Sequence, residues 1–244
     1  MEIFIDSANL EEIEEALKRG FIRGITTNPS IVAKEEKTDF NSLLIKIGEL
    51  IKKYRPNTHL SIEVFSKVPE EIERQAKEFQ KILNLPELSI KVHIGWDELE
   101  IIRKLAKDGF SVNCTCCMTV TQAIMAAAAG SKYVSLFWGR IRDGGQDENF
   151  KEERDKVIKE KTLREEDFDP ALVVKKVKKF LTQNYSETKL IIGSIRSASD
   201  IMDAGFCGAD IVTIPPKLFP GMINHFKTDE VINQFLTDFQ AWLK

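Results

Sequence analysis

Three side chains that could carry out chemistry lie in short apolar runs: Lys91 in "SIKVHI", Asp6 in "EIFID" and Glu63 in "LSIEVF". Removing a lysine from water disfavours its charged form, so burial favours a neutral amine that can form a Schiff base with a carbonyl carbon. Alternatively, Lys91 only neutralises a buried carboxylate. Two carboxylates around one lysine favour the Schiff base, because this chemistry needs proton carriers beside the nucleophile.

The apolar runs place polar residues on one face and aliphatic residues on the other, because side chains alternate along a strand. In a barrel covered by helices, the aliphatic face suits the helices and the polar face then points inward. The predicted interior ring consists of Asp6, Asn28, Glu63, Lys91, Asn113, Thr115 and Ser135.

Arginines follow two of the later runs. Arg140 lies in "LFWGRIRDGG", and Ser194 and Arg196 lie in "IIGSIRSAS". The planar guanidinium matches phosphate oxygens, and the loops after the seventh and eighth strands of barrels often bind phosphate. Each arginine alone is typical of a surface, but their shared position beside the polar ring predicts a phosphorylated substrate.

Eight strand-like runs alternate with amphipathic stretches such as "NLEEIEEALKRG" and "PEEIERQAKEFQKIL". This alternation predicts an α/β fold, a (β/α)8 TIM barrel with an additional C-terminal helix. A dinucleotide-binding sheet is disfavoured, because no G-x-G-x-x-G motif follows a strand. The strand candidates are "EIFID", "GITTN", "LSIEVF", "SIKVHI", "SVNCTC", "YVSLFW", "LIIGSI" and "IVTIP".

Two segments exceed a minimal barrel. The highly charged stretch at about 147–170 is expected to be a solvated helix or loop, with a substrate lid or oligomer contact as alternatives. Residues about 228–244 read as an extra helix whose aromatic residues share a face, so it should pack on this barrel or on a neighbouring subunit. With no linker or repeat, residues 1–244 are expected to form a single barrel domain.

Composition narrows the class of protein. A formal net charge of −3 argues against bulk nucleic-acid binding, which usually needs a basic surface. No apolar run approaches the roughly 20 residues of a membrane helix. The N-terminus, "MEIFIDSANL", does not resemble a secretory signal, so we expect a cytoplasmic protein with reduced cysteines.

These residues together resemble the transaldolase family, specifically its short branch together with fructose-6-phosphate aldolase. The resemblance covers nearly the whole chain and rests on "FIDSANLEEI", "GITTNPSIVAKE", "SIEV", "IKV", "NCT", "YVSLFWGRI", "SIRSASD" and "GADIVTIPPKL". The combination of "TTNPS" with an N-terminal "FID" is highly specific.

The resemblance implies a class I aldol mechanism without metal or cofactor. Lys91 would form the Schiff base, Asp6 would take the hydroxyl proton during carbon–carbon cleavage, and Glu63 with Thr115 would position and activate water. The implied substrate-binding residues are Thr27, Asn28, Asn113, Ser135 and Phe137, and the implied phosphate-binding residues are Arg140, Ser194 and Arg196. The implied partners are small-molecule sugar phosphates and further copies of the chain, in a pentamer or decamer.

The implied activity is transfer of a dihydroxyacetone unit between sugar phosphates, in the non-oxidative pentose phosphate pathway. The alternatives are an aldolase that releases free dihydroxyacetone and a non-catalytic phosphosugar-binding barrel. Fructose-6-phosphate aldolases typically carry Gln and Tyr where this chain has Glu63 and Phe137, which favours transfer.

Two features depart from expectation or remain open. His93 shares the inward face with Lys91 where the family usually has proline nearby; it is an acid/base or phosphate contact, or simply a structural histidine. The cluster "CTCC" lacks the spacing of a zinc site. Alternation predicts that Cys114 and Cys116 face the helices as small apolar residues and that Cys117 faces the other way.

Overall fold

A closed barrel of eight parallel strands forms the centre of the computed structural model, which describes residues 1–243. Every strand pairs with the next one in the sequence, and the last pairs with the first. The strands are β1 (Glu2–Asp6), β2 (Gly24–Thr26), β3 (His59–Glu63), β4 (Leu88–His93), β5 (Val112–Cys117), β6 (Tyr133–Phe137), β7 (Lys189–Gly193) and β8 (Ile211–Ile214). The predicted (β/α)8 barrel is confirmed.

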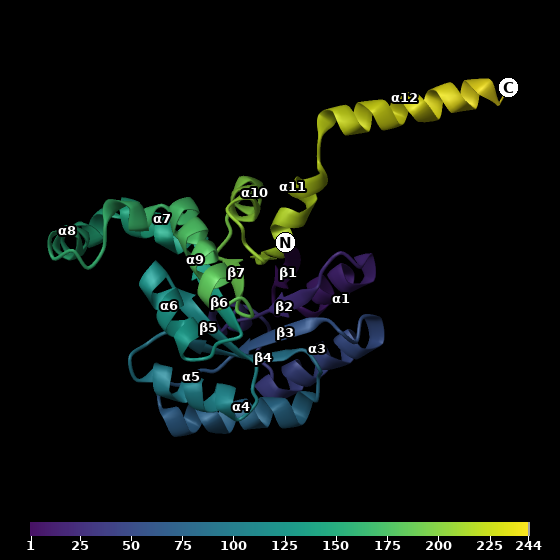
Figure 1. Ribbon diagram of the computed structural model, residues 1–244. Helices are drawn as coiled ribbons and strands as arrows, with labels where there is room; N and C mark the ends of the chain where they lie inside the picture. Colours follow the sequence, from purple (N-terminus) through teal and green to yellow (C-terminus); the bar gives the residue numbers. More distant parts are fainter. Residues whose placement is uncertain (244) are drawn as a thin grey trace.

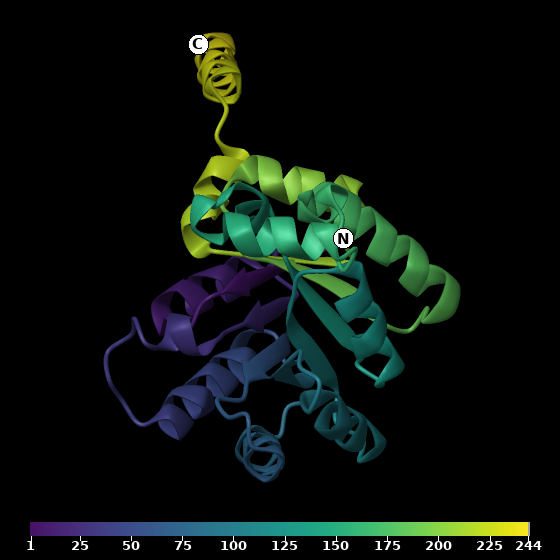
Figure 2. The same ribbon diagram turned by 90° about the vertical axis from the view of Figure 1, so that its left-hand side faces the viewer.

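Helices surround the strands (Figures 1 and 2). They are α1 (Leu10–Arg19), α2 (Pro29–Val32), α3 (Phe40–Tyr54), α4 (Pro69–Leu83), α5 (Glu98–Lys107), α6 (Val120–Ala128), α7 (Trp138–Gln146), α8 (Lys151–Lys159), α9 (Pro170–Asn184), α10 (Ala198–Phe206), α11 (Phe219–Ile223) and α12 (Phe226–Trp242). None of the helices within residues 1–243 is long and apolar enough to cross a membrane.

The core has two parts, as expected for a barrel. A large cluster fills the layer between strands and helices, and a small one of Phe4, Tyr133, Ile191 and Ile211 fills the inside of the barrel. Gly24 is needed beside this inner cluster, because a Cβ there would lie 2.5 Å from the Phe4 ring. The inner cluster closes the barrel below the polar residues.

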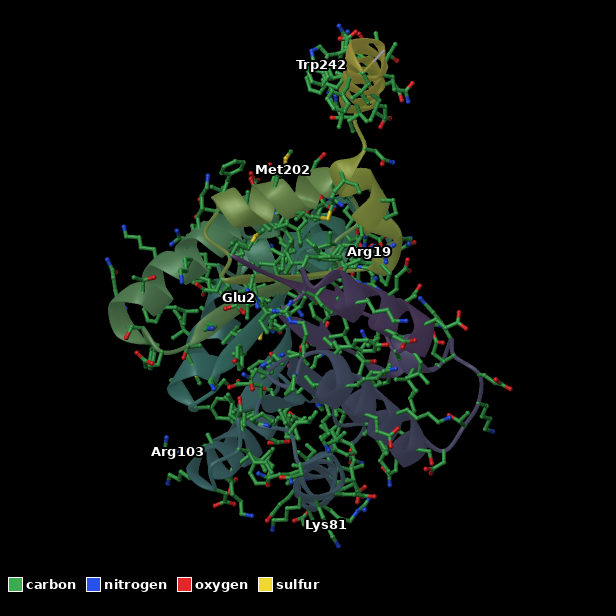
Figure 3. The ribbon with its side chains drawn as sticks, turned by 90° about the vertical axis from the view of Figure 1, so that its right-hand side faces the viewer. Glu2, Arg19, Lys81, Arg103, Met202 and Trp242 are labelled. Carbon is green, nitrogen blue, oxygen red and sulfur yellow. The ribbon has the colours of Figure 1, made fainter. Side chains whose placement is uncertain are left out.

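The segments beyond the minimal barrel lie at its edge. The charged stretch at 147–170 contains two short 3₁₀ helices, Glu148–Phe150 and Glu165–Phe168, with α8 between them, as expected for a solvated segment. Helix α12 projects away from the barrel, with Trp242 far from it (Figures 1 and 3). Its aromatic side chains are exposed, so it does not pack on its own barrel, and packing on a neighbouring subunit, the other alternative, stays a prediction. Residue 244, the last of the predicted helix, lies outside the described residues.

The prediction for the cysteines is confirmed for Cys114 and wrong for Cys116 and Cys117, because β5 is irregular. Its register with β6 shifts between Cys114 and Cys117, and Cys116 has a φ of 60°. Such a bulge adds one residue and reverses the alternation of side chains after it. Cys114 and Cys117 therefore both lie in the helix-facing core, their sulfurs 4.0 Å apart. Cys116 lies instead where the charges of Glu63 and Lys91 act on its thiol.

Candidate active site

Lys91 lies inside the barrel on β4 and is 4% exposed. The strand register places it beside Glu63 of β3 and Asn113 of β5. Its Nζ lies 3.0 Å from Glu63 Oε2 and donates a 2.8 Å hydrogen bond to the carbonyl oxygen of Thr27. The amine is therefore held at a fixed point, with a carboxylate that can accept its proton.

Asp6 ends β1 inside the same barrel. Its Oδ1 accepts a 2.6 Å hydrogen bond from the Thr26 hydroxyl, which also lies 2.5 Å from the Thr213 hydroxyl. Burial raises the pKa of Asp6 above its usual value, while the positive charge of Lys91 opposes this rise. A carboxyl group with a raised pKa takes up a proton more readily than an ordinary one and can return it later, as acid–base catalysis requires.

Two buried hydroxyl groups beside Lys91 have no hydrogen-bond partner: those of Thr27 and Thr115. Buried polar groups are normally hydrogen-bonded, and an unsatisfied one usually marks a place for water or a ligand. The register pairs Thr115 with His93, two residues beyond Lys91 along β4. These hydroxyls can therefore bind a reacting water or a substrate oxygen.

Asn113 belongs to a buried chain of hydrogen bonds. Its Oδ1 accepts a 2.7 Å bond from the Ser135 hydroxyl, and its Nδ2 donates a 3.2 Å bond to Ser61 Oγ. Ser61 Oγ lies 2.8 Å from His59 Nε2. Burial lowers the pKa of His59 to about 3, so the imidazole is neutral and one of its two ring nitrogens can accept a hydrogen bond. Ser135 and Ser61 contact the Asn113 amide at its oxygen and at its nitrogen, which holds the side chain in place.

Asn28 and Phe137 lie at the ends of their strands. Asn28 Oδ1 accepts the main-chain N–H of Ile31 and so caps α2, while the residue also lines a cavity of about 220 Å³ together with Thr27 and Glu63. Phe137 ends β6, and its ring lies near Gly193 of β7. Both of these predicted substrate-binding residues thus border the interior that contains Lys91.

The predicted phosphate-binding residues come together from the start of α7 and the loop after β7. The N–H of Gly139 donates a 3.0 Å hydrogen bond to the carbonyl oxygen of Ser194, which joins the first turn of α7 to that loop. A Cβ at Gly139 would lie 2.6 Å from Arg196 Nε, so the backbones approach as only glycine allows. Arg140 and Arg196 are both largely exposed, and Asp143 contacts each of them.

The imidazole of His93 contacts a carboxylate that follows it in the chain. Its Nε2 lies 2.9 Å from Glu98 Oε1, and Glu98 is buried. This contact supports the structural reading of His93, with one ring nitrogen satisfied by a carboxylate. Among the residues that the structure describes, no three His, Cys, Asp or Glu side chains are placed to hold a metal ion together.

Some residues of the site were not singled out from the sequence. Thr26 is not among the residues to which the sequence assigns a role, although its hydroxyl binds Asp6. Asp143 could have been noticed, since it follows Arg140 by three positions and therefore lies on the same side of a helix. Cys116 gave no usable signal, because a bulge is not visible in a strand's alternation pattern.

This arrangement, a buried lysine between two carboxylates at the mouth of a (β/α)8 barrel, is that of a Schiff-base enzyme. Residues 3–243 match the family model described as transaldolase/fructose-6-phosphate aldolase, and the chain belongs to this family. The protein is therefore an enzyme of the transaldolase class, for which a lysine Schiff base is characteristic.

Similar proteins span the same length. The chain is 34% identical over 241 residues to a protein of Dehalococcoides mccartyi and 35% identical over 242 residues to one of Carboxydothermus hydrogenoformans, with 99% of both chains covered in each case. It is 31% identical over 244 residues to a protein of Methanococcus vannielii, with both chains covered completely. All three relatives are described as probable transaldolases.

Proposed function

We propose that the protein transfers a dihydroxyacetone unit from fructose 6-phosphate or sedoheptulose 7-phosphate to erythrose 4-phosphate or glyceraldehyde 3-phosphate, in the non-oxidative pentose phosphate pathway. The observation that carries the proposal is the position of Lys91, 3.0 Å from Glu63 in the barrel interior that Asp6 also enters. The relatives described as probable transaldolases support the same reaction.

In the first half-reaction, Lys91 Nζ attacks the C2 carbonyl carbon of the ketose phosphate. Water leaves as the iminium forms. Glu63 and the Thr115 hydroxyl position and activate this water. Asp6 then takes the proton of the C4 hydroxyl group, the C3–C4 bond breaks, and its electron pair moves into the iminium to give an enamine. The aldose phosphate leaves, while the three-carbon unit stays on Lys91.

The second half-reaction reverses these steps with a different aldose. The enamine carbon attacks the aldehyde carbon of the acceptor, and Asp6 returns its proton to the new hydroxyl oxygen. Water then adds to the iminium carbon and releases the product ketose from Lys91. Asn113 binds substrate hydroxyl groups throughout, and its hydrogen bonds with Ser135 and Ser61 support this role by holding the amide in position.

The experiment that tests transfer against release compares turnover with and without an acceptor. With fructose 6-phosphate alone, the proposal predicts about one equivalent of glyceraldehyde 3-phosphate per active site and little free dihydroxyacetone, with sustained turnover only after erythrose 4-phosphate is added. Equal rates of dihydroxyacetone production in both conditions would indicate an aldolase that releases its product.

The same proposal includes a homo-oligomer, a pentamer or decamer, in the cytoplasm. An isolated helix is marginal in water, and α12 exposes Phe235, Phe239 and Trp242 together with most of its other apolar residues. An apolar groove of about 600 Å³ between α1 and α11 offers a neighbouring copy a surface on which to seat this helix. Light scattering on Phe235→Glu/Phe239→Glu should give a smaller assembly than the unmodified protein; an unchanged mass would contradict this arrangement.

The four free thiols support the cytoplasmic location, because cysteines stay reduced in that compartment.

A further inference from the structure

One carboxylate contacts both arginines at the rim of the barrel. Arg196 Nη1 donates a 2.6 Å hydrogen bond to Asp143 Oδ1, and Nη2 of the same guanidinium donates to Oδ2. Arg140 Nη1 lies 4.0 Å from Asp143 Oδ2. The negative group that these two arginines meet in the structure is thus the side chain of Asp143.

A carboxylate and a phosphate group each present two oxygens to a guanidinium, so they compete for the same two N–H donors. Two contacts limit the position of Arg196. Its main-chain N–H donates a 3.0 Å hydrogen bond to Asp200 Oδ2, and Gly139 packs closely against its side chain. Arg196 is 44% and Asp143 32% exposed, so a ligand can reach the pair from solvent. A phosphate that binds Arg196 through both Nη atoms must displace Asp143.

The proposed reaction empties this anion site in the middle of every cycle. The phosphate group belongs to the part of the ketose that leaves as an aldose, whereas the unit that stays on Lys91 carries no phosphate. A second aldose phosphate must then enter the same site. Two arginines without a competing carboxylate would hold the first aldose phosphate tightly and slow this exchange.

We propose that Asp143 is a built-in competitor of the substrate phosphate, which pairs with Arg196 when the site is empty and gives way when a sugar phosphate binds. Its re-pairing with Arg196 assists release of the first aldose phosphate. This inference rests on the proposed function, since it takes Arg196 as a phosphate ligand.

A positioning role for Asp143 makes the opposite prediction, which allows a decisive test. If Asp143 only held the guanidinium in place, its neutralisation would weaken phosphate binding. If Asp143 competes, its neutralisation strengthens phosphate binding. The expected decrease in Kd is roughly two- to fivefold, the size of effect for a partly exposed ion pair.

The probe is inorganic phosphate, titrated calorimetrically into the full-length protein at constant ionic strength with chloride as the other anion. Asp143→Asn should lower the Kd, and Asp143→Ser provides a second neutral variant if the first folds poorly. Glu71→Gln is the matched control, because Glu71 binds Arg74 with a similar two-oxygen fork on α4 and should leave the Kd unchanged. An unchanged or raised Kd in both Asp143 variants overturns the proposal.

A kinetic measurement examines release directly. In a single turnover of fructose 6-phosphate without acceptor, Asp143→Asn should release glyceraldehyde 3-phosphate more slowly and should show a lower KM for the ketose. Unchanged or faster release contradicts a competing role.

Arg196→Ala separates this inference from the proposed function. If that variant binds inorganic phosphate as well as the unmodified protein does, the assigned phosphate site is wrong and the inference fails with it. If Arg196→Ala weakens binding and the Asp143 variants do not strengthen it, the phosphate site stands and only the competition is refuted.

Discussion

Lys91 Nζ lies 3.0 Å from Glu63 Oε2 on the neighbouring strand, and the two residues pair directly in the register of β3 and β4. A carboxylate at this distance can accept a proton from the amine or from a water molecule, whereas an amide cannot. The chemical identity of residue 63 therefore decides how water and protons are handled at the Schiff base.

Replacing Glu63 by Gln together with Phe137 by Tyr should shift the enzyme from transfer towards release of free dihydroxyacetone. The amide removes a proton acceptor, and the added phenol hydroxyl changes the handling of water beside the enamine. The ratio of dihydroxyacetone to transferred product, measured with erythrose 4-phosphate present, should rise by about tenfold or more, the size expected from altered acid–base catalysis. An unchanged ratio would count against this interpretation of the two positions.

Asp6→Asn should lower kcat by about 10²- to 10⁴-fold, the usual contribution of a general acid or base. The same change should raise the melting temperature at neutral pH. Because burial raises the pKa of Asp6 in the folded protein, the folded state binds more protons than the unfolded state above the usual pKa of the carboxyl group. Stability is thus lost as pH rises towards the raised pKa, and the neutral amide avoids this loss.

The melting temperatures of Asp6→Asn and the unmodified protein should be compared at pH 8 and at pH 4. The stabilisation should be present at pH 8 and should shrink at pH 4, where Asp6 is increasingly protonated. A variant that is less stable than the unmodified protein at pH 8 would contradict the assignment of a costly buried carboxylate.

Acid should destabilise the protein through His59. Burial lowers the pKa of this imidazole from 6.5 to about 3, so between these values the unfolded state binds more protons than the folded state. Stability is therefore fully present above pH 6.5 and falls as pH decreases, by up to about 1.4 kcal/mol per pH unit. Urea unfolding at pH 6.5 and 4.5 measures this loss.

His59→Gln supplies the control for the acid prediction. The amide oxygen of Gln can accept the Ser61 hydroxyl proton, yet the side chain does not titrate. The variant should lose less unfolding free energy between pH 6.5 and 4.5 than the unmodified protein does. Equal losses would assign the acid sensitivity to other groups, such as the carboxylates.

Cys116 should react with iodoacetamide before Cys114 and Cys117, because the bulge in β5 turns it away from the apolar core that contains the other two. Burial raises the pKa of the Cys116 thiol, so labelling should be slow at neutral pH and faster at pH 9. Fructose 6-phosphate should protect Cys116, and peptide mass spectrometry identifies the labelled residue. Labelling that is unaffected by substrate would place this thiol outside the site.

Much of the site follows from alternation along the strands. The inward positions of Asp6, Glu63 and Lys91 could be predicted because each shares a face with other polar residues, and a closed parallel barrel brings such faces together. The reactive centre was thus visible in the sequence as polar residues in apolar runs.

Other features depend on structure that no local pattern encodes. The bulge at Cys116 adds a residue to β5 and reverses the faces that alternation assigns. The pairing of Asp143 with Arg196 joins helix α7 to the loop after β7, 53 positions apart in the chain. The direction of α12 cannot be predicted from the sequence either. An amphipathic pattern shows that a helix needs a partner but not which surface supplies it.

Trapping with borohydride tests the central claim most directly. The protein is incubated with fructose 6-phosphate, reduced with sodium borohydride, and digested for peptide mass spectrometry. The Schiff-base mechanism predicts a three-carbon adduct on Lys91 that is absent from Lys91→Ala and retained in Lys34→Ala, whose lysine is another positive charge near Asp6. No adduct on Lys91, or an adduct that persists in Lys91→Ala, would contradict the Schiff-base mechanism.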